Sequence, residues 1–264
     1  MTRTLVLDGH VHIYPFYDLN KAVQAGIGHL TAAYRKGGES GAVIPIWLLS
    51  ERSDCRFFEK TAESLQSGEF VIEKTGEEES LAVKRNGDTV LYIVAGRQLV
   101  SSDSLEVISI ASTCFLEDRK ADTAGVIDYV NEHGGVPVLN WAPGKWFFKR
   151  GEIVDSLLEK YDPEKLLFGD TSLRTRLWRT PALMKKAIDS GYKVIAGSDP
   201  LPFKDEEEQI GRYGFTMSGE FDTSLPAASI RNMLRDSAVQ IGRIGERNRM
   251  VSFATRQFKI MREK

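Results

Sequence analysis

The sequence predicts an α/β fold built around a parallel sheet or barrel. Apolar runs alternate with segments of helical spacing along most of the chain, a rhythm that favours parallel strands joined by helices. The 264 residues fit one large α/β barrel or two small domains, and either can bury a sizeable core. The core strands number about seven, near residues 4, 43, 90, 106, 137, 167 and 194.

The first part of the chain supplies two of these strands with a helix between them. The apolar run 4–7 predicts a buried strand, and the run 42–49 predicts a strand covered on both faces. Between them, residues 19–34 follow helical spacing, with Asp18 as the N-cap and Gly37-Gly38 at the end. A second helix is expected around 54–65.

The segment of about 67–88 breaks this alternation. Residues 70–74 and 81–84 predict short strands, and Asn86-Gly87-Asp88 predicts a hairpin turn into a strand over 89–95. We therefore expect a small β-rich insertion on the core.

A strand is expected over 105–111, and the alternation is regular from residue 121 onward. Helices are expected over 121–133, 153–161 and 181–190, and strands over 136–139, 166–168 and 193–196. Further helices are expected over 205–212 and 226–235. The basic tail, about 243–264, is expected to form a helix packed on the barrel or on a partner subunit. The whole chain, 1–264, is expected to be a single domain.

Composition favours a soluble cytoplasmic protein. A net charge of −2 gives no electrostatic reason to expect nucleic acid or an anionic membrane as a partner. Cys55 and Cys114 have no metal-binding or disulfide-framework spacing, which favours a reducing compartment. The sequence shows no secretory leader and no apolar run long enough to span a bilayer. The oligomeric state stays open, a homo-oligomer included.

The strongest functional signal is Asp8-Gly9-His10-Val11-His12, where the first strand ends. Alternate strand residues project to one side, so Asp8, His10 and His12 share a face. Two imidazoles and a carboxylate are suited to half of a divalent-metal site. In the alternative interpretation, the histidines only form hydrogen bonds within a packed barrel mouth. Polar residues at other strand ends would share that mouth, namely Gln98, Asn140, Asp170 and Asp199.

The segment from Asp8 to His12 resembles the DxHxH signature of the polymerase and histidinol phosphatase (PHP) family, and it is similar to the HxH of the wider amidohydrolase superfamily. Four later segments resemble PHP motifs in the same order: Val94-Ala95-Gly96-Arg97-Gln98, Leu105-Glu106-Val107-Ile108-Ser109-Ile110, the strand that runs into Asn140, and Gly197-Ser198-Asp199. The resemblance implies a distorted (β/α)7 TIM-like barrel and a metal cluster that hydrolyses phosphate esters. It also implies that His10, His12 and Asp199 are metal ligands and that Asp8 orients them.

Several positions depart from the family pattern. Gln98 stands where a glutamate is expected, Asn140 or Trp141 where a histidine is expected, and Leu201 where the last histidine would be. Glu106 occupies a position that is often histidine and could still bind metal. A single zinc, manganese or iron ion is therefore expected instead of a full cluster.

The first hypothesis is a divergent metal-dependent hydrolase that acts on a small anionic substrate, a phosphoric ester before an amide. Its metal ligands would be His10, His12, Asp199 and Glu106, with Asp199 or Asp170 as the general base. The candidate substrate-binding residues are Arg97, Arg174, Asn140 and Trp141. The alternative is a catalytically degenerate barrel that binds a ligand or serves in an assembly.

Overall fold

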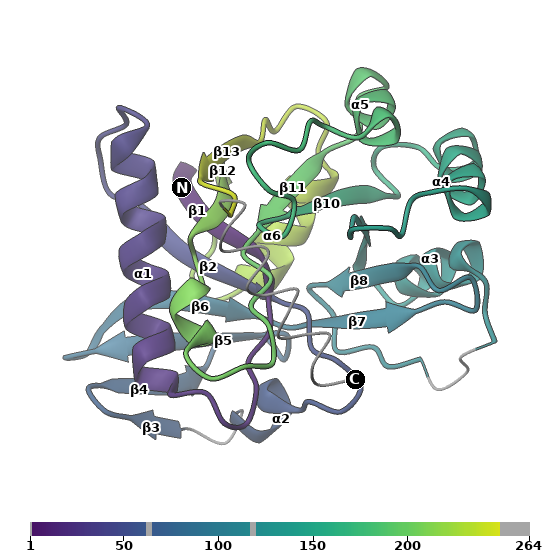
Figure 1. The fold of residues 1–264 in the computed structure, drawn as a ribbon. Helices are drawn as coiled ribbons and strands as arrows, with labels where there is room; N and C mark the ends of the chain where they lie inside the picture. The colour runs from purple at the N-terminus through teal and green to yellow at the C-terminus, as the bar shows by residue number, and fades with distance from the viewer. Residues whose placement is uncertain (1, 62–64, 117–119, 249–264) are drawn as a thin grey trace.

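Two mixed β-sheets form the frame of the molecule (Figure 1). The computed structural model describes all residues except 1, 62–64, 117–119 and 249–264. The larger sheet has eight strands in the order β13 (Gly242–Gly245), β12 (Tyr213–Glu220), β1 (Thr2–Val11), β2 (Ile44–Leu49), β6 (Asp88–Val94), β5 (Ser80–Arg85), β4 (Phe70–Lys74) and β3 (Leu65–Ser67). The smaller sheet has five, in the order β11 (Val194–Gly197), β10 (Leu167–Thr171), β9 (Val136–Asn140), β8 (Glu106–Ile110) and β7 (Gly96–Val100).

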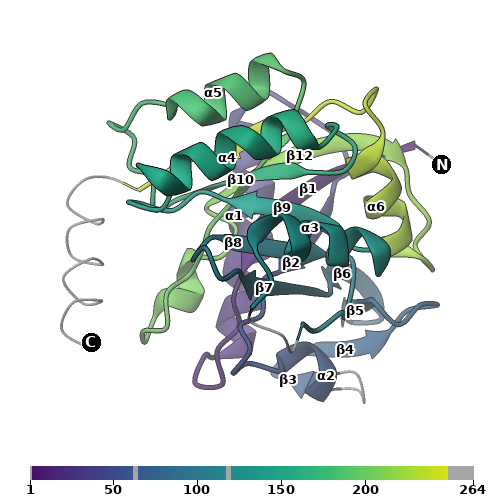
Figure 2. The ribbon, with the colours of Figure 1, turned by 90° about the vertical axis from the view of Figure 1, so that its right-hand side faces the viewer.

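Six α-helices occur among the described residues. They are α1 (Leu19–Lys36), α2 (Phe57–Thr61), α3 (Thr123–Glu132), α4 (Lys149–Lys160), α5 (Ala182–Asp189) and α6 (Pro226–Arg235). Helices α3, α4 and α5 lie over one face of the smaller sheet (Figure 2), and their apolar side chains form one cluster with those of β8, β9 and β10. None of the helices in the described ranges is both long and apolar enough to cross a membrane.

Helix α1 forms as the sequence predicts. The Asp18 carboxylate accepts a hydrogen bond from the Lys21 amide (3.1 Å), which satisfies one of the free amides of the first turn. The buried residues of α1 recur every three or four positions and form the face that packs on the larger sheet: Ala22, Val23, Gly26, Leu30 and Tyr34. The helix ends at Gly37, as expected.

The predicted hairpin is confirmed, and it extends the larger sheet. Strand β5 pairs with β6 around a tight turn in which Asn86 has φ 54° and Gly87 has φ 88°. Both residues tolerate this left-handed conformation better than others do. Since β6 also pairs in parallel with β2, strands β3, β4 and β5 continue the same sheet outward.

The prediction of a distorted (β/α)7 TIM-like barrel is wrong. The seven expected strands all form, but they are divided between the two sheets. The second edge of β1 pairs with antiparallel β12, which the sequence reasoning did not predict, with Leu7 opposite Phe215. In addition, β7, β8 and β9 follow one another as antiparallel neighbours, whereas a β/α barrel has parallel strands.

Two other expectations change in detail. The helix expected over 205–212 is a short 3-10 helix, η1 (Glu206–Gln209). The expected C-terminal helix, about 243–264, falls mainly on 249–264, outside the described residues, and its first residues, 243–245, belong to strand β13 (Gly242–Gly245).

The two sheets share an apolar core and approach each other closely where β11 meets β1. The core includes Leu7 and Ile46 from one sheet and Val138, Leu167 and Ile195 from the other. A Cβ atom on Gly197 would lie 2.4 Å from the His10 amide nitrogen, so only glycine allows this approach. The carboxyl ends of β1 and β11 are therefore held side by side.

Candidate metal centre

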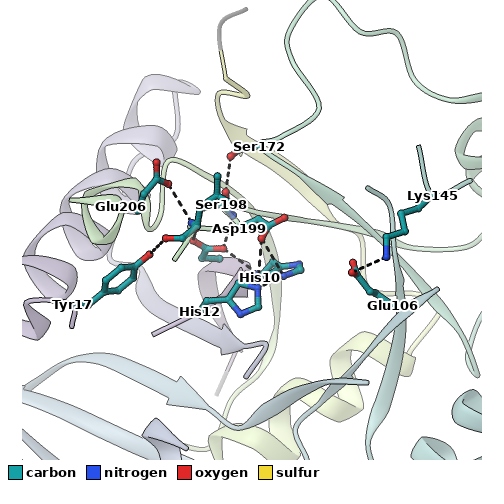
Figure 3. A network of polar contacts seen from close by, with 11 residues as sticks. His10, His12, Tyr17, Glu106, Lys145, Ser172, Ser198, Asp199 and Glu206 are labelled. Atoms are coloured by element: carbon teal, nitrogen blue, oxygen red, sulfur yellow. Dashed lines mark hydrogen bonds and ion pairs between the residues drawn. The ribbon is translucent and has the colours of Figure 1, made fainter. Parts of the chain in front are cut away.

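Three side chains meet where β1 and β11 end (Figure 3). The Nε2 atoms of His10 and His12 are 2.9 Å apart, and they lie 3.5 and 3.6 Å from Oδ1 of Asp199. All three residues are buried, with exposed fractions of 3%, 6% and 9%. The sequence prediction of His10, His12 and Asp199 thus corresponds to one compact group.

The local backbone explains how the group is held. His10 lies on β1, and His12 follows the strand with its side chain on the same side. Asp199 comes two residues after the last residue of β11, and its amide donates to the His10 carbonyl (3.0 Å). Its φ of 52° lies in the left-handed region, which aspartate adopts more readily than most residues.

The donor set suits a divalent metal ion. Zinc ligands lie about 2.0–2.2 Å from the ion, so tetrahedral ligand atoms are about 3.4 Å apart. The three observed separations, 2.9, 3.5 and 3.6 Å, bracket that spacing. Burial lowers the pKa of His10, which favours the neutral imidazole that a metal requires. Without an ion, the same contact is a hydrogen bond in which the ring protonated on Nε2 donates to the unprotonated Nε2 of the other ring.

Asp8 supports the group without belonging to it. Its carboxylate accepts hydrogen bonds from the His10 amide (3.1 Å), the Ser198 amide (2.8 Å), the Ser198 hydroxyl (2.5 Å) and the Gly211 amide (2.7 Å). Burial is the main influence on this carboxyl and raises its pKa to about 6, against the effect of these donors. Asp8 therefore ties β1 to the residue that precedes Asp199, which fits the orienting role that the resemblance implies.

Glu106 lies near the group but outside it. Because β8 runs antiparallel to β9, the first residue of β8 lies beside the carboxyl end of β9. There the Glu106 carboxylate pairs with Lys145 Nζ at 3.2 Å (Figure 3). Its charge acts to raise the pKa of His10, so it contributes to the field at the site.

Asp170 forms a separate buried ion pair. Its two oxygens accept from Arg174 Nε (2.7 Å) and from the second guanidinium nitrogen (2.5 Å), and the Tyr213 hydroxyl also donates to it (2.9 Å). Asp170 and Arg174 are each 1% exposed. The candidate general base Asp170 and the candidate substrate-binding residue Arg174 are thus paired with each other and do not join the group of His10, His12 and Asp199.

The other three candidate substrate-binding residues are buried as well. Arg97 pairs with Glu51 (3.8 Å) and with Glu59. Trp141 packs edge-on against Trp178, with ring centroids 5.3 Å apart. Asn140 is 2% exposed, and its side-chain oxygen has no hydrogen-bond partner.

Sequence reasoning missed three residues at this site. The Tyr14 ring lies 5.7 Å from that of His12, and burial, followed by the charge of Asp199, raises the pKa of its hydroxyl well above the usual range. The Arg52 side chain interacts with the Tyr14 hydroxyl and remains 45% exposed. Tyr14 continues the same-parity series of His10 and His12, so alternation could have identified it, as the Gly-Ser-Asp motif could have identified Ser198. No local pattern indicates Arg52.

Comparisons with known proteins find a distant similarity among solved structures. No protein-family model matches the chain, and no curated protein matches it. Among solved structures, it is similar to a two-domain protein from Bacteroides vulgatus that contains a predicted PHP-like metal-dependent phosphoesterase, at 14% identity and a TM-score of 0.44. The match covers 91% of this chain but 64% of that one, so the chain spans less than two thirds of its length. We therefore infer function from the geometry of the site.

Proposed function

We propose that this protein is a metal-dependent hydrolase that acts on a small anionic substrate, in the first instance a phosphoric ester. The observation that carries the proposal is the buried group of His10, His12 and Asp199, whose ligand atoms have the mutual spacing of a metal site. Among the described residues, His10, His12 and Asp199 are the histidine, cysteine or acidic side chains that come close enough together to hold one metal ion. One ion, zinc, manganese or iron, is the cofactor that such a donor set fits.

Each residue in or beside the group has its own proposed role. A divalent ion held there would supply Lewis-acid activation of water and of the scissile bond. Asp199 is the carboxylate placed to accept a proton, since Asp170 is already paired with Arg174. Asp8 holds the backbone on which His10 and Asp199 are carried.

Arg52 is the side chain best placed to attract an anionic group. Arg97 and Arg174 are 5% and 1% exposed in their side chains and are neutralised by buried carboxylates. Arg52 pairs with Asp54 at 3.1 Å, but both side chains are well exposed, so the pair is weak and can be exchanged for a substrate anion. Its contact with Tyr14 places this cation near His12.

An ester panel tests the proposal. Metal-free protein is loaded with Mn²⁺ or Zn²⁺ and assayed on aryl phosphates and on the matching aryl amides. We expect turnover of the phosphates that requires added metal, and a loss of about 100-fold or more in kcat for Asp199→Asn. Asp189→Asn, at an exposed position of α5, is the matched control and should keep full activity. Phosphate turnover that is independent of metal, or unchanged in Asp199→Asn, contradicts the proposal.

A ligand-binding protein without catalysis is the second candidate. The observation that favours it is the commitment of Asp170, Arg97 and Arg174 to buried ion pairs. Stoichiometric metal binding without turnover of any ester or amide would support this candidate over the hydrolase.

A further inference from the structure

A basic groove lies beside α1, away from the metal centre. It encloses about 580 Å³ and is bounded by one face of α1, by Arg176 after β10, by Arg212 before β12, and by 245–248. The floor on α1 is made by small side chains, Ala32 and Ala33. Two hydrogen bonds lie between the groove and Asp199. The Asn248 side chain donates to the Ser172 hydroxyl (3.3 Å), and that hydroxyl donates to the Ser198 carbonyl (2.6 Å).

Four cationic side chains from four separate chain segments line this groove, namely Lys36, Arg176, Arg212 and Arg247. The lining contains one acidic residue, Glu246, which pairs with Lys36 (2.7 Å) and with Arg176. Four positive charges and one negative charge leave a formal charge of +3. The chain as a whole carries −2, so the groove is opposite in sign to the molecule around it.

Two of these cations have no acidic partner in the described part of the chain. No carboxylate there pairs with Arg212 or Arg247, although Arg247 donates to the Trp178 carbonyl (3.1 Å). Burial, followed by the positive charge of Arg174, lowers the pKa of Arg247, and the charge of Asp170 acts in the opposite direction. Gathering like charges costs folding free energy, and an anion in the groove would offset that cost.

We propose that the groove binds a small soluble polyanion with adjacent phosphate groups, at a site separate from His10, His12 and Asp199. Its volume falls within the range of small-molecule pockets, and the guanidinium groups provide forks that match phosphate oxygens. The chain's own tail is a poor occupant, because residues 249–264 carry Arg249, Arg256, Lys259, Arg262 and Lys264 against one acid, Glu263.

Calorimetric titration with inorganic pyrophosphate tests the proposal. The full-length protein is used in chelator at low ionic strength, so that metal at the other site makes no contribution. We expect saturable binding of about one pyrophosphate per chain, with an affinity that Arg212→Ala lowers about tenfold or more. Glu246→Gln should tighten binding, since it removes the acid from the groove. Lys185→Ala, which removes an exposed cation from α5, should leave the affinity unchanged.

Several outcomes would overturn the proposal. One is the absence of pyrophosphate binding by folded wild-type protein, and another is equal binding by wild type and Arg212→Ala with matching thermal unfolding curves. Tighter binding of citrate than of pyrophosphate would assign the groove to carboxylates instead. An affinity for single-stranded oligonucleotides that exceeds the affinity for pyrophosphate and rises with length would assign it to a polymer.

Discussion

Asp8 is the residue with the clearest pH-dependent effect on stability. Its pKa is raised from 3.8 to about 6, so the folded state holds the proton more tightly than the unfolded chain does. The stability linked to that proton is complete below pH 3.8 and is lost as the pH rises through about 6.

Asp8→Asn should remove this dependence. Between pH 3.5 and 7, the unfolding free energy of metal-free wild type should fall by about 3 kcal/mol relative to that of the variant, because the pKa rises from 3.8 in the unfolded chain to about 6 in the folded one. Urea denaturation at several pH values measures this difference. A constant difference between the two proteins over that range would show that Asp8 does not titrate as described.

At the residue scale, the sequence predicted which three side chains come together better than it predicted their surroundings. His10, His12 and Asp199 could be predicted because strand alternation and strand ends are local properties of the sequence. The pairing of Asp170 with Arg174 could have been considered from their spacing, but the Tyr213 contact depends on β12, which comes 43 residues later. The place of Glu106 depends on the direction of β8, which a single sequence does not show.

At the element scale, the close approach of β11 to β1 holds the candidate metal centre together. Gly197→Ala would place a Cβ 2.4 Å from the His10 amide nitrogen, so the strands must separate. We expect a loss of roughly 1–3 kcal/mol in unfolding free energy together with weaker metal binding. Gly28→Ala is the matched control: an added Cβ on this exposed helical residue meets no atom within 4 Å, and the change should stabilise the protein by about 1 kcal/mol. Similar effects of the two changes would contradict the role assigned to this contact.

Most elements could be predicted because their signals are local. The N-cap Asp18, the helix α6 and the turn at Asn86 all formed where expected. Strand β12 was missed although Tyr213, Phe215 and Met217 alternate with smaller or polar residues, and only a helix over 205–212 was expected between the strand at 193–196 and the helix at 226–235. That one strand decides the partner of β1 and hence the form of the sheet.

At the scale of the whole molecule, the contact of Asp170 with Tyr213 ties the two sheets together. Asp170 lies on β10 in the smaller sheet, and its partner Tyr213 lies on β12 in the larger one. Asp170→Asn leaves the buried Arg174 without its counter-charge, which should cost about 3–5 kcal/mol of unfolding free energy. Asp155→Asn, which breaks the exposed pair with Lys186, should cost less than about 1 kcal/mol. Equal costs in urea denaturation would show that Asp170 does not have this structural role.

The closed barrel could not be excluded from the sequence, because strand positions do not specify strand partners. The seven expected strands are present, yet β12 and the antiparallel run from β7 to β9 give two mixed sheets. The ends of β1 and β11 still meet, so the mouth residues of the predicted barrel include the group that the structure brings together, His10, His12 and Asp199.

Metal content is the most direct test of the central claim. The protein is purified without an affinity-tag metal, loaded with Zn²⁺ or Mn²⁺, freed of excess ion by gel filtration and analysed by mass spectrometry. We predict about one ion per chain in wild type and in His133→Ala, whose histidine caps α3, and little or none in His10→Ala and His12→Ala. Folded wild type without metal, or equal metal in all four proteins, would contradict the account, and His10 and His12 would then be a hydrogen-bonded pair.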